Sequence, residues 1–512
     1  MTQRFSKITI LAFLTAGFFL SSLPFFAAPL SAAPMIDTTH DRVQTTLDPG
    51  MKRIGTVTPR SAREVGPSML SIGCEMLPRD YGDFEQFKEF IPPLGLARIR
   101  LHAGWAKIEK EQGVYDFEWL DRQVNYLLEN GLEPLLETSY GNPIYPGGGG
   151  ASLSDGLPHG ETALKAWDAY VDALTKHYPQ IKNWACWNEP NNKKENSPEI
   201  VAENNIRTAR IIKKNIPDAK IAGLILSWVN IKFTERYLQI LKDQDALGLF
   251  EWMVYHDYRE NPDLCYPQVQ EWVKLVHSFA PDMKIWNGES GATSDPHYSH
   301  AISSGKWNTE LTQCKWNARR LIGDLGHGYE SLLFTFYDPA YDHPERYSHF
   351  VDPIWIRTRT DRFMKRMGLI KCNEDFKVLK VKPAYYSAQN IASIFDASVT
   401  AAPMGAEVKS DAKATALYSF RQAETGYPLI AYWDSSNHPE NSNTTIPAQL
   451  TLKGVAFAEP VWVDVISGAI YEIPEEKIKK DGDSVTFTVP LYDAPGIITE
   501  KALVIKKNTK ND

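Results

Sequence analysis

The stretch LARIRLHAGWAKIEKEQGVYDFEWLDRQVNYLLENGLEPLLETS, residues 96–139, joins two short apolar segments through a longer amphipathic one. Its ends, LARIRLH and LEPLLETS, have the length and apolar content of buried strands. The middle, DFEWLDRQVNYLLENG, is predicted to be a helix, with Asp116 as N-cap and Gly131 as C-terminal stop. A strand, a helix and another strand in this order are typical of a βαβ unit with parallel strands.

The same alternation continues on both sides of this stretch. Strands are predicted at residues 68–75, 96–102, 132–139, 181–187, 219–226, 249–256, 282–288 and 330–338. Helices are predicted at 84–95, 116–131, 161–178, 232–243, 266–280, 309–326 and, after a long insertion, 382–395. This rhythm favours a closed (β/α)8 TIM barrel, assigned to residues 67–396, over an open doubly wound sheet. No GxGxxG turn, the usual mark of the dinucleotide-binding open sheet, follows the first strand.

The first 33 residues have the features of a secretory signal peptide. Arg4 and Lys7 form a short positive region, residues 8–26 are almost all apolar, and small residues lead to an expected cleavage site near Ala32 or Ala33. An uncleaved membrane anchor is the alternative, but the run of small residues favours cleavage. No other stretch is apolar for long enough to span a bilayer. We therefore expect a secreted or periplasmic protein that has no membrane attachment after cleavage.

The segments on either side of the barrel differ from it in pattern. Residues 34–66 are polar without clear periodicity and are predicted to be a leader strand or linker. From 397 to 512 we predict an antiparallel β-sandwich, because short strands alternate with Gly, Pro and Asn turns. Its strands are expected at 414–422, 427–435, 448–454, 460–473, 483–491 and 501–507, with no helix among them. The sandwich could bind carbohydrate or cover one side of the barrel, and we favour the second role.

The composition limits the classes of partner and cofactor. The 512 residues carry a formal charge of −8, and loss of the signal peptide's two positive residues leaves about −10. Because no dense basic patch appears, neither nucleic acid nor an anionic membrane is an expected partner. Aromatic residues make up 12% of the chain, as core filling or, for some of them, as stacking faces of a sugar-binding cleft.

Cysteine usage points to neither a zinc site nor a fixed disulfide pattern. The five cysteines contain no CxxC pair, and their odd number leaves at least one thiol without an internal partner. An exported chain could form one or two disulfides, and the sequence does not assign them.

Functional side chains of a (β/α)8 barrel gather at the carboxyl ends of its strands. The candidates there are Arg98, Arg100, His102, Trp105, Tyr140, Asn142, Asn188, Glu189, Trp228, Asn230, His256, Tyr258, Glu289, Tyr337 and Asp338. Two carboxylates stand out, Glu189 and Glu289, because each follows a strand and has a Trp-Asn step nearby. Glycoside hydrolysis requires two such groups, one protonated and one ionised, on either side of the glycosidic bond.

The motifs WNEPN at the end of strand four and WNGES at the end of strand seven resemble the large clan of retaining (β/α)8 glycoside hydrolases, clan A. The stretch 100–137 is similar to strands two and three of its xylosidase-like, arabinofuranosidase-like and cellulase-like members. The run MGLIK…VKPAYYSAQNIASIF resembles the clan's approach to the last helix, and the trailing sandwich is similar to that of family-39 β-xylosidases. The resemblance covers about residues 68–505.

The resemblance implies roles for the residues that match the clan's motifs. Glu189 is the expected acid/base, Glu289 the expected nucleophile, and Asn188 is expected to hold the sugar's 2-hydroxyl. Tyr258 matches the tyrosine that orients the nucleophile, and His256 matches the histidine of a His-x-Tyr pattern.

Further substrate contacts are expected from the same strand ends. Arg100 matches the arginine whose charge keeps the nucleophile ionised, although Arg98, two residues earlier on the same face, is an open alternative. Trp286 is expected in the wall of the cleft, and Trp105 and Tyr140 are further expected substrate contacts.

The chain departs from the clan's pattern in two places. Strand eight of the clan usually ends in a Trp that forms the floor of the −1 subsite, whereas this chain has FTFYDPAY. Phe336 or Tyr337 is expected to replace that Trp, or Trp355 in the insertion could supply the platform. The glycine-rich loop at 140–160 matches no single family.

Taken together, the sequence predicts a secreted retaining glycosidase that acts on oligo- or polysaccharides by double displacement, without metal or organic cofactor. A non-catalytic carbohydrate-binding protein on the same fold and a transglycosylase with the same residues are the alternatives. Xyloside, glucoside, galactoside and arabinofuranoside substrates all remain compatible, as do exo and endo action, and the sequence does not bear on the oligomeric state.

Overall fold

The structure, a computed structural model, describes residues 46–153, 156–295, 308–341 and 363–505. The predicted signal peptide, residues 1–33, and Trp355 lie outside these residues, so the expectations made for them stay predictions. Within the described ranges, no helix combines the length and the apolar character that crossing a bilayer requires.

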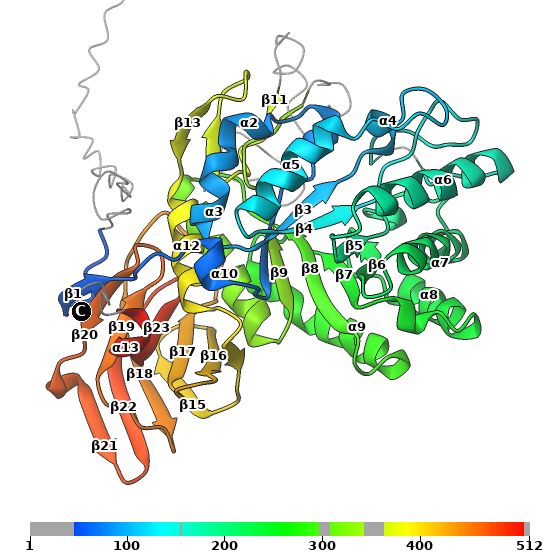
Figure 1. Cartoon of the computed structure of the whole chain (residues 1–512). Helices are drawn as coiled ribbons and strands as arrows, with labels where there is room; N and C mark the ends of the chain where they lie inside the picture. The colour runs from blue at the N-terminus through cyan, green and yellow to red at the C-terminus, as the bar shows by residue number, and fades with distance from the viewer. Residues whose placement is uncertain (1–45, 154–155, 296–307, 342–362, 506–512) are drawn as a thin grey trace, which may run out of the picture. The chain divides into compact units, whose positions relative to one another are not determined.

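Eight parallel strands form the closed barrel that the sequence predicts (Figure 1). They are β2 (Leu70–Gly73), β3 (Arg98–His102), β4 (Glu133–Glu137), β5 (Asn183–Ala185), β6 (Lys220–Leu226), β7 (Trp252–His256), β8 (Lys284–Ser290) and β9 (Glu330–Leu333). Each strand pairs with the next, and β2 closes the ring by pairing with β9, Ser71 opposite Leu332. The strands therefore end at one rim, where the candidate residues were expected.

Helices follow most of the strands. The long ones are α5 (Glu118–Glu129), α6 (Glu161–His177), α7 (Pro198–Asn215), α8 (Ile231–Asp243), α9 (Tyr266–Phe279), α10 (Glu310–Gly326) and α12 (Pro383–Ile394). Helix α7 follows strand β5 and was not predicted, although its start carries a clear signal: Ser197 accepts a hydrogen bond from the Ile200 N–H, and Pro198 occupies the first helical position.

Two predicted helices differ from the structure in detail. Residues 84–95 form three short turns, α2 (Phe84–Phe87), η2 (Lys88–Phe90) and α3 (Ile91–Leu94), because Pro92 and Pro93 cannot supply N–H groups to a continuous helix. Helix α5 begins after its predicted cap, with Phe117 in the capping position. The Asp116 carboxylate nevertheless accepts a hydrogen bond from the Glu118 N–H, 3.0 Å away.

The C-terminal part is a β-domain of two antiparallel sheets. The larger has the order β1-β20-β19-β23-β17-β16-β14 and the smaller β15-β18-β22-β21. Their strands are β1 (Lys52–Thr56), β14 (Val399–Ala401), β15 (Gly405–Ser410), β16 (Thr415–Gln422), β17 (Pro428–Asp434), β18 (Ile446–Lys453), β19 (Pro460–Asp464), β20 (Ala469–Glu472), β21 (Ile478–Asp481), β22 (Ser484–Leu491) and β23 (Gly496–Glu500).

Two segments of this domain can be compared with the sequence prediction. The leader segment contains a strand, one of the two predicted possibilities: β1 pairs with β20 at the edge of the larger sheet, so the chain contributes to the β-domain before the barrel begins. The strand predicted at 501–507 is wrong, because Lys501–Val504 form a helical turn, α13, directly after β23.

Cysteine pairing can also be described. All five cysteines lie within the described residues, and each is a buried free thiol. The one or two disulfides considered from the sequence are therefore not present among them.

Helix α10 is buried along nearly its whole length, and two of its cations, Lys315 and Arg319, contact loops of the β-domain. Lys315, with a fully buried side chain, donates to Asp493 at 2.6 Å and to the Glu440 carbonyl at 3.0 Å. Arg319 donates to the Asn437 carbonyl at 3.0 Å. These hydrogen bonds offset the free-energy cost of burying the charges of Lys315 and Arg319.

Replacing Lys315 with Met should therefore destabilise the fold by about 3 kcal/mol, because it leaves Asp493 without its cation. Urea unfolding measures this change. Lys176→Met is the matched control, since Lys176 pairs with Asp172 at the same 2.6 Å but is 63% exposed, and it should have little effect. Equal losses in the two variants would contradict the structural role of Lys315.

Candidate active site

Two sequence motifs place the candidate carboxylates at the barrel rim. Glu189 follows β5 and caps the short turn η3 (Pro190–Asn192) with φ of 46°, in the left-handed region. Such a backbone costs a non-glycine residue roughly 1–3 kcal/mol and is found mostly at functional sites. Glu289 lies within β8, after Gly288, where a Cβ would approach Val254 to 2.3 Å. Glycine therefore lets β8 approach β7 closely next to the candidate nucleophile.

The structure brings Glu189 and Glu289 together around His256. Ligand atoms of the three residues all lie within 4.8 Å of one another. A hydrogen bond of 2.7 Å joins His256 Nδ1 to Glu189 Oε1, and the same nitrogen lies 3.6 Å from Glu289 Oε2. Because His256 is fully buried, it holds the two carboxylates in a fixed relation.

Glu289 is surrounded by groups that favour its ionised form. Tyr258 donates its hydroxyl to Oε2 at 2.7 Å, and Arg100 Nη1 approaches Oε1 to 3.3 Å. Burial alone would raise the pKa of Glu289, but the charges of His256 and Arg100 and the Tyr258 hydrogen bond lower it below its usual value. Burial and the charge of Glu289 in turn raise the pKa of Tyr258, which therefore stays protonated and donates.

Glu189 has a different set of partners. Its Oε1 bonds to His256, and its Oε2 accepts from the Asn192 amide at 2.7 Å. Neither partner is an arginine or a lysine. The two carboxylates thus have unlike electrostatic surroundings, which is what separate acid and nucleophile roles require.

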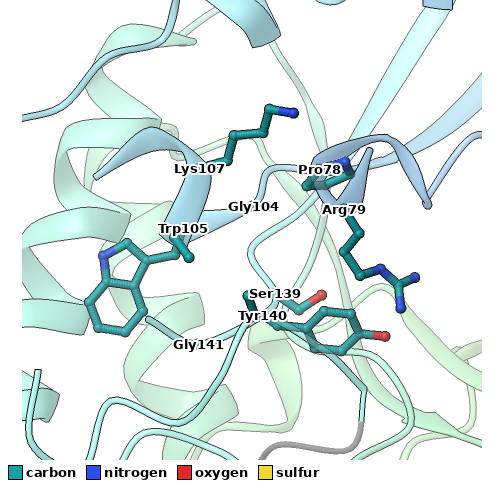
Figure 2. Close-up of a pocket in the computed structure, with 10 residues that line it drawn as sticks. Pro78, Arg79, Gly104, Trp105, Lys107, Ser139, Tyr140 and Gly141 are labelled. Atoms are coloured by element: carbon teal, nitrogen blue, oxygen red, sulfur yellow. The ribbon is translucent and has the colours of Figure 1, made fainter. Parts of the chain in front are cut away.

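Asn188 and Tyr140 belong to the same network. The Asn188 Oδ1 accepts from Arg100 Nη2 at 2.7 Å, and its Nδ2 donates to the Tyr140 hydroxyl at 2.8 Å. The guanidinium of Arg79 lies 5.4 Å from the centre of the Tyr140 ring. Figure 2 shows the Tyr140 hydroxyl and the Arg79 guanidinium extending to the same side of the pocket.

Arg100, and not Arg98, lies beside Glu289. Arg100 is fully buried and also donates to Glu137 (Nη2, 2.6 Å) and the Gly288 carbonyl (Nη1, 3.0 Å). Arg98 instead pairs with Glu330 and lies 5.2 Å over the ring of Trp252. The two arginines share a face of β3, but only Arg100 is close enough to the rim to reach the carboxylates.

Two tryptophans expected to contact substrate are packed inside the protein. Trp105 is fully buried, stacks on Tyr170 at 5.5 Å, and in Figure 2 its indole points away from Arg79 and Tyr140. Trp286 is also fully buried, in the barrel interior beside Trp252. These positions do not support Trp105 and Trp286 as cleft-wall residues, because their rings fill the core.

The replacement expected for the clan's strand-eight Trp is likewise buried. Tyr337 has no exposed surface, and its ring stacks on Phe87 with centroids 4.5 Å apart. Phe336 is fully buried too, with its ring 5.5 Å from that of Phe87. Among the described residues, the end of the eighth barrel strand, β9, therefore offers no exposed aromatic platform.

Two buried acids and one lysine near Glu189 and Glu289 were not predicted from the sequence. Glu75 and Glu137 are the last residues of SIGCE and EPLLE, and their positions at strand ends are the signal that could have found them. Lys365 lies 5.2 Å over the ring of Phe334. Burial lowers the pKa of Lys365 to about 8, while the charges of Glu289 and Glu189 oppose that shift. No sequence pattern marks this lysine, because it lies within the insertion after the eighth predicted strand.

Glu189, His256 and Glu289 also have the spacing of three metal ligands. Their carboxylate oxygens already accept hydrogen bonds from Asn192, His256 and Tyr258. The positive charge of Arg100 at 3.3 Å from Glu289 opposes a further cation. The donor set therefore fits a hydrogen-bonded acid pair better than a metal site.

Comparison with known proteins agrees with this architecture. The glycoside hydrolase family 42 model, described as β-galactosidase, matches residues 83–148. No curated protein sequence matches this chain significantly.

Solved structures match nearly the whole chain at low sequence identity. A family 39 glycoside hydrolase from Bacteroides cellulosilyticus WH2 aligns with a TM-score of 0.58 and 16% identity, over 91% of this chain and 86% of that one. A monomeric β-xylosidase from Caulobacter crescentus CB15 aligns with a TM-score of 0.52 and 16% identity, over 87% and 97%. A family 30 endoxylanase from Clostridium papyrosolvens C71 gives 0.52 and 12%, over 87% and 97%. The chain therefore shares the fold of these glycoside hydrolases over both its barrel and its β-domain.

Proposed function

We propose that the protein is a retaining glycoside hydrolase that cleaves β-linked glycosides of oligo- or polysaccharides. The observation that carries this proposal is the approach of Glu189 and Glu289, since one carboxylate oxygen of each lies within 4.8 Å of one oxygen of the other. Retaining glycosidases hold their two carboxyl groups about 5–5.5 Å apart, whereas inverting enzymes need roughly 6.5–9.5 Å to admit a water. The fold shared with glycoside hydrolases supports the same function.

In the first step, Glu289 attacks the anomeric carbon as an ionised carboxylate. Tyr258 and Arg100 orient it through their bonds to its two oxygens. Glu189 protonates the departing glycosidic oxygen at the same time, so the C–O bond breaks as the glycosyl–enzyme ester forms. Asn188, fixed by Arg100 and Tyr140, is placed to bond the sugar's 2-hydroxyl.

In the second step, Glu189 acts as a base. It removes a proton from a water that attacks the anomeric carbon, and Glu289 leaves as a carboxylate. His256, bonded to Glu189 Oε1, keeps that carboxyl turned toward Glu289 through both steps. The product keeps the configuration of the substrate.

The proposal extends to the substrate class, to export of the protein and to its binding partners. The matching structures include a β-xylosidase and an endoxylanase, so aryl β-xylosides and xylan are the first substrates to test. We propose that the N-terminal segment directs export and that saccharides are the main partners.

The two alternatives are separable by experiment. A non-catalytic carbohydrate-binding protein does not need two carboxylates held this closely, so the geometry disfavours it. A transglycosylase would use the same residues, and product analysis with added sugar acceptors distinguishes it from a hydrolase.

Replacing Glu289 with Ala should lower kcat by about four powers of ten, because no group remains to form the ester. Hydrolysis of an aryl β-glycoside measures the loss. Added azide should restore turnover and give a glycosyl azide of inverted configuration, since a small anion fits the vacated position. A loss of less than tenfold would rule Glu289 out as nucleophile.

Replacing Glu189 with Ala should affect substrates according to their leaving group. An activated aryl glycoside needs no proton, so its first step should persist, whereas an alkyl glycoside should lose activity by roughly 10²–10⁴-fold. Comparing kcat/KM for the two substrates measures the difference. Equal losses for both would exclude Glu189 as the acid.

Replacing Tyr258 with Phe should move the acid limb of kcat/KM to higher pH. The Tyr258 hydroxyl lowers the pKa of Glu289, so its removal raises the pH at which Glu289 becomes ionised. A pH–rate profile measures the shift. Tyr255→Phe is the control, because the Tyr255 hydroxyl lies near Asp324 and not Glu289, and its profile should match the wild type. An unmoved limb in Tyr258→Phe would contradict the orienting role.

A further inference from the structure

The guanidinium of Arg100 faces three carboxyl groups, those of Glu75, Glu137 and Glu289. Glu137 takes the strongest contacts, 2.6 Å from Nη2 and 3.2 Å from Nε. The remaining nitrogen, Nη1, lies between Glu75 Oε1 at 3.4 Å and Glu289 Oε1 at 3.3 Å. Glu75 and Glu289 therefore share one donor nitrogen.

Glu75 is the least stabilised of the three acids. Its side chain is 1% exposed, and among the described residues its Oε2 has no hydrogen-bond partner. Glu137 has two nitrogens of Arg100 and the Ser139 hydroxyl, and Glu289 has Tyr258 in addition to Arg100. An unpartnered buried oxygen costs less in a neutral carboxyl than in a carboxylate, so Glu75 is the member that stays protonated.

The electrostatics of the cluster agree with this assignment. Burial raises the pKa of Glu75 to about 8, against the lowering effect of Arg100, and the charge of Glu289 adds to the rise. The titratable or charged groups that face Glu75 are Arg100 on β3, Glu137 on β4, Tyr258 after β7, Glu289 on β8, Tyr337 after β9 and the adjacent Cys74.

We propose that Glu75 is a positioning residue for the glycosidase reaction, which must be protonated for Arg100 Nη1 to hold Glu289 in place. Nη1 donates one hydrogen to the Gly288 carbonyl, 3.0 Å away, and while Glu75 is neutral the other Nη1 hydrogen is left to the carboxylate of Glu289. When Glu75 ionises, it competes for Nη1 and repels Glu289, so the nucleophile loses its alignment. Displacement of a reacting group by about 1 Å is enough to cost roughly 10²-fold in rate. This inference rests on the proposed function.

The test is the alkaline limb of kcat/KM with a 2,4-dinitrophenyl β-glycoside. This leaving group needs no proton from Glu189, so the ionisation of Glu189 does not limit the rate. Between pH 7 and pH 9 the wild type should lose activity roughly tenfold as Glu75 ionises near pH 8. Lys365, whose pKa is also about 8, titrates in the wild type and in every variant, so the loss that Glu75→Gln removes is the part that belongs to Glu75. Glu75→Gln, of the same shape but neutral at every pH, should lose less than twofold and should stay within about fivefold of the wild type at pH 7.

Glu330→Gln is the matched control. Glu330 is also a buried acid paired with an arginine of β3, Arg98, but it lies away from the two carboxylates. This variant should keep the wild-type alkaline limb. The same limb in Glu75→Gln as in the wild type would overturn the proposal.

Thermal unfolding provides a readout that needs no activity. Because the pKa of Glu75 is raised in the folded state, its contribution to stability is present at pH 4 and is lost as the pH rises toward 8. The Tm of Glu75→Gln relative to the wild type should therefore rise from pH 5 to pH 8 and then level off. A difference that does not change with pH would overturn the protonated state of Glu75.

A failure of the proposed function can be distinguished from a failure of this inference. A wild type that hydrolyses no glycoside refutes the proposed function, while the Tm comparison still decides the charge of Glu75. Where Glu75→Gln does not fold, Gly73→Ala replaces it, because a Cβ at Gly73 would lie 2.2 Å from Glu75 Oε1 and push that carboxyl aside. An alkaline limb unchanged in Gly73→Ala would contradict the proposal.

Discussion

The polar groups at the barrel rim depend on one buried cation, the guanidinium of Arg100. It contacts the carboxylates of Glu137 and Glu289 and the side-chain oxygen of Asn188. A fully buried charge is stable only when it is paired and hydrogen-bonded. The side chains of these residues therefore lie within hydrogen-bond distance of the Arg100 guanidinium. The position of Glu289 is thus a consequence of neutralising this cation.

The closed barrel makes this pairing possible. Strand β3 lies next to β2, which is followed by Glu75, and next to β4, which ends in Glu137, while β8 supplies Glu289 from further around the ring. In an open sheet, residues from strands five positions apart would not meet. Gly288 contributes by letting β8 approach β7, where His256 joins the two candidate carboxylates.

Much of this arrangement could be predicted from the sequence, and the failures have a physical cause. The alternation of strands and helices predicted the barrel, and the motifs WNEPN and WNGES pointed to Glu189 and Glu289 because chain position alone places strand ends at the rim. Trp105 and Trp286 were expected in the cleft, yet sequence position does not say whether a ring faces the rim or the core. Glu75 went unnoticed because its importance comes from Arg100, a residue of another strand.

The difference between Glu189 and Glu289 likewise arises from their partners and not from residue type. Glu289 receives a hydroxyl and a guanidinium, which favour its anion. Glu189 receives an imidazole and an amide, and its left-handed backbone turns it out of the strand. The imidazole of His256 contacts both carboxyl groups. A change of charge on one carboxyl therefore alters the electrostatic environment of the other through this ring. Two identical side chains therefore have different electrostatic surroundings, because Arg100 contacts only one of them, and such a difference is what separate acid and nucleophile roles require.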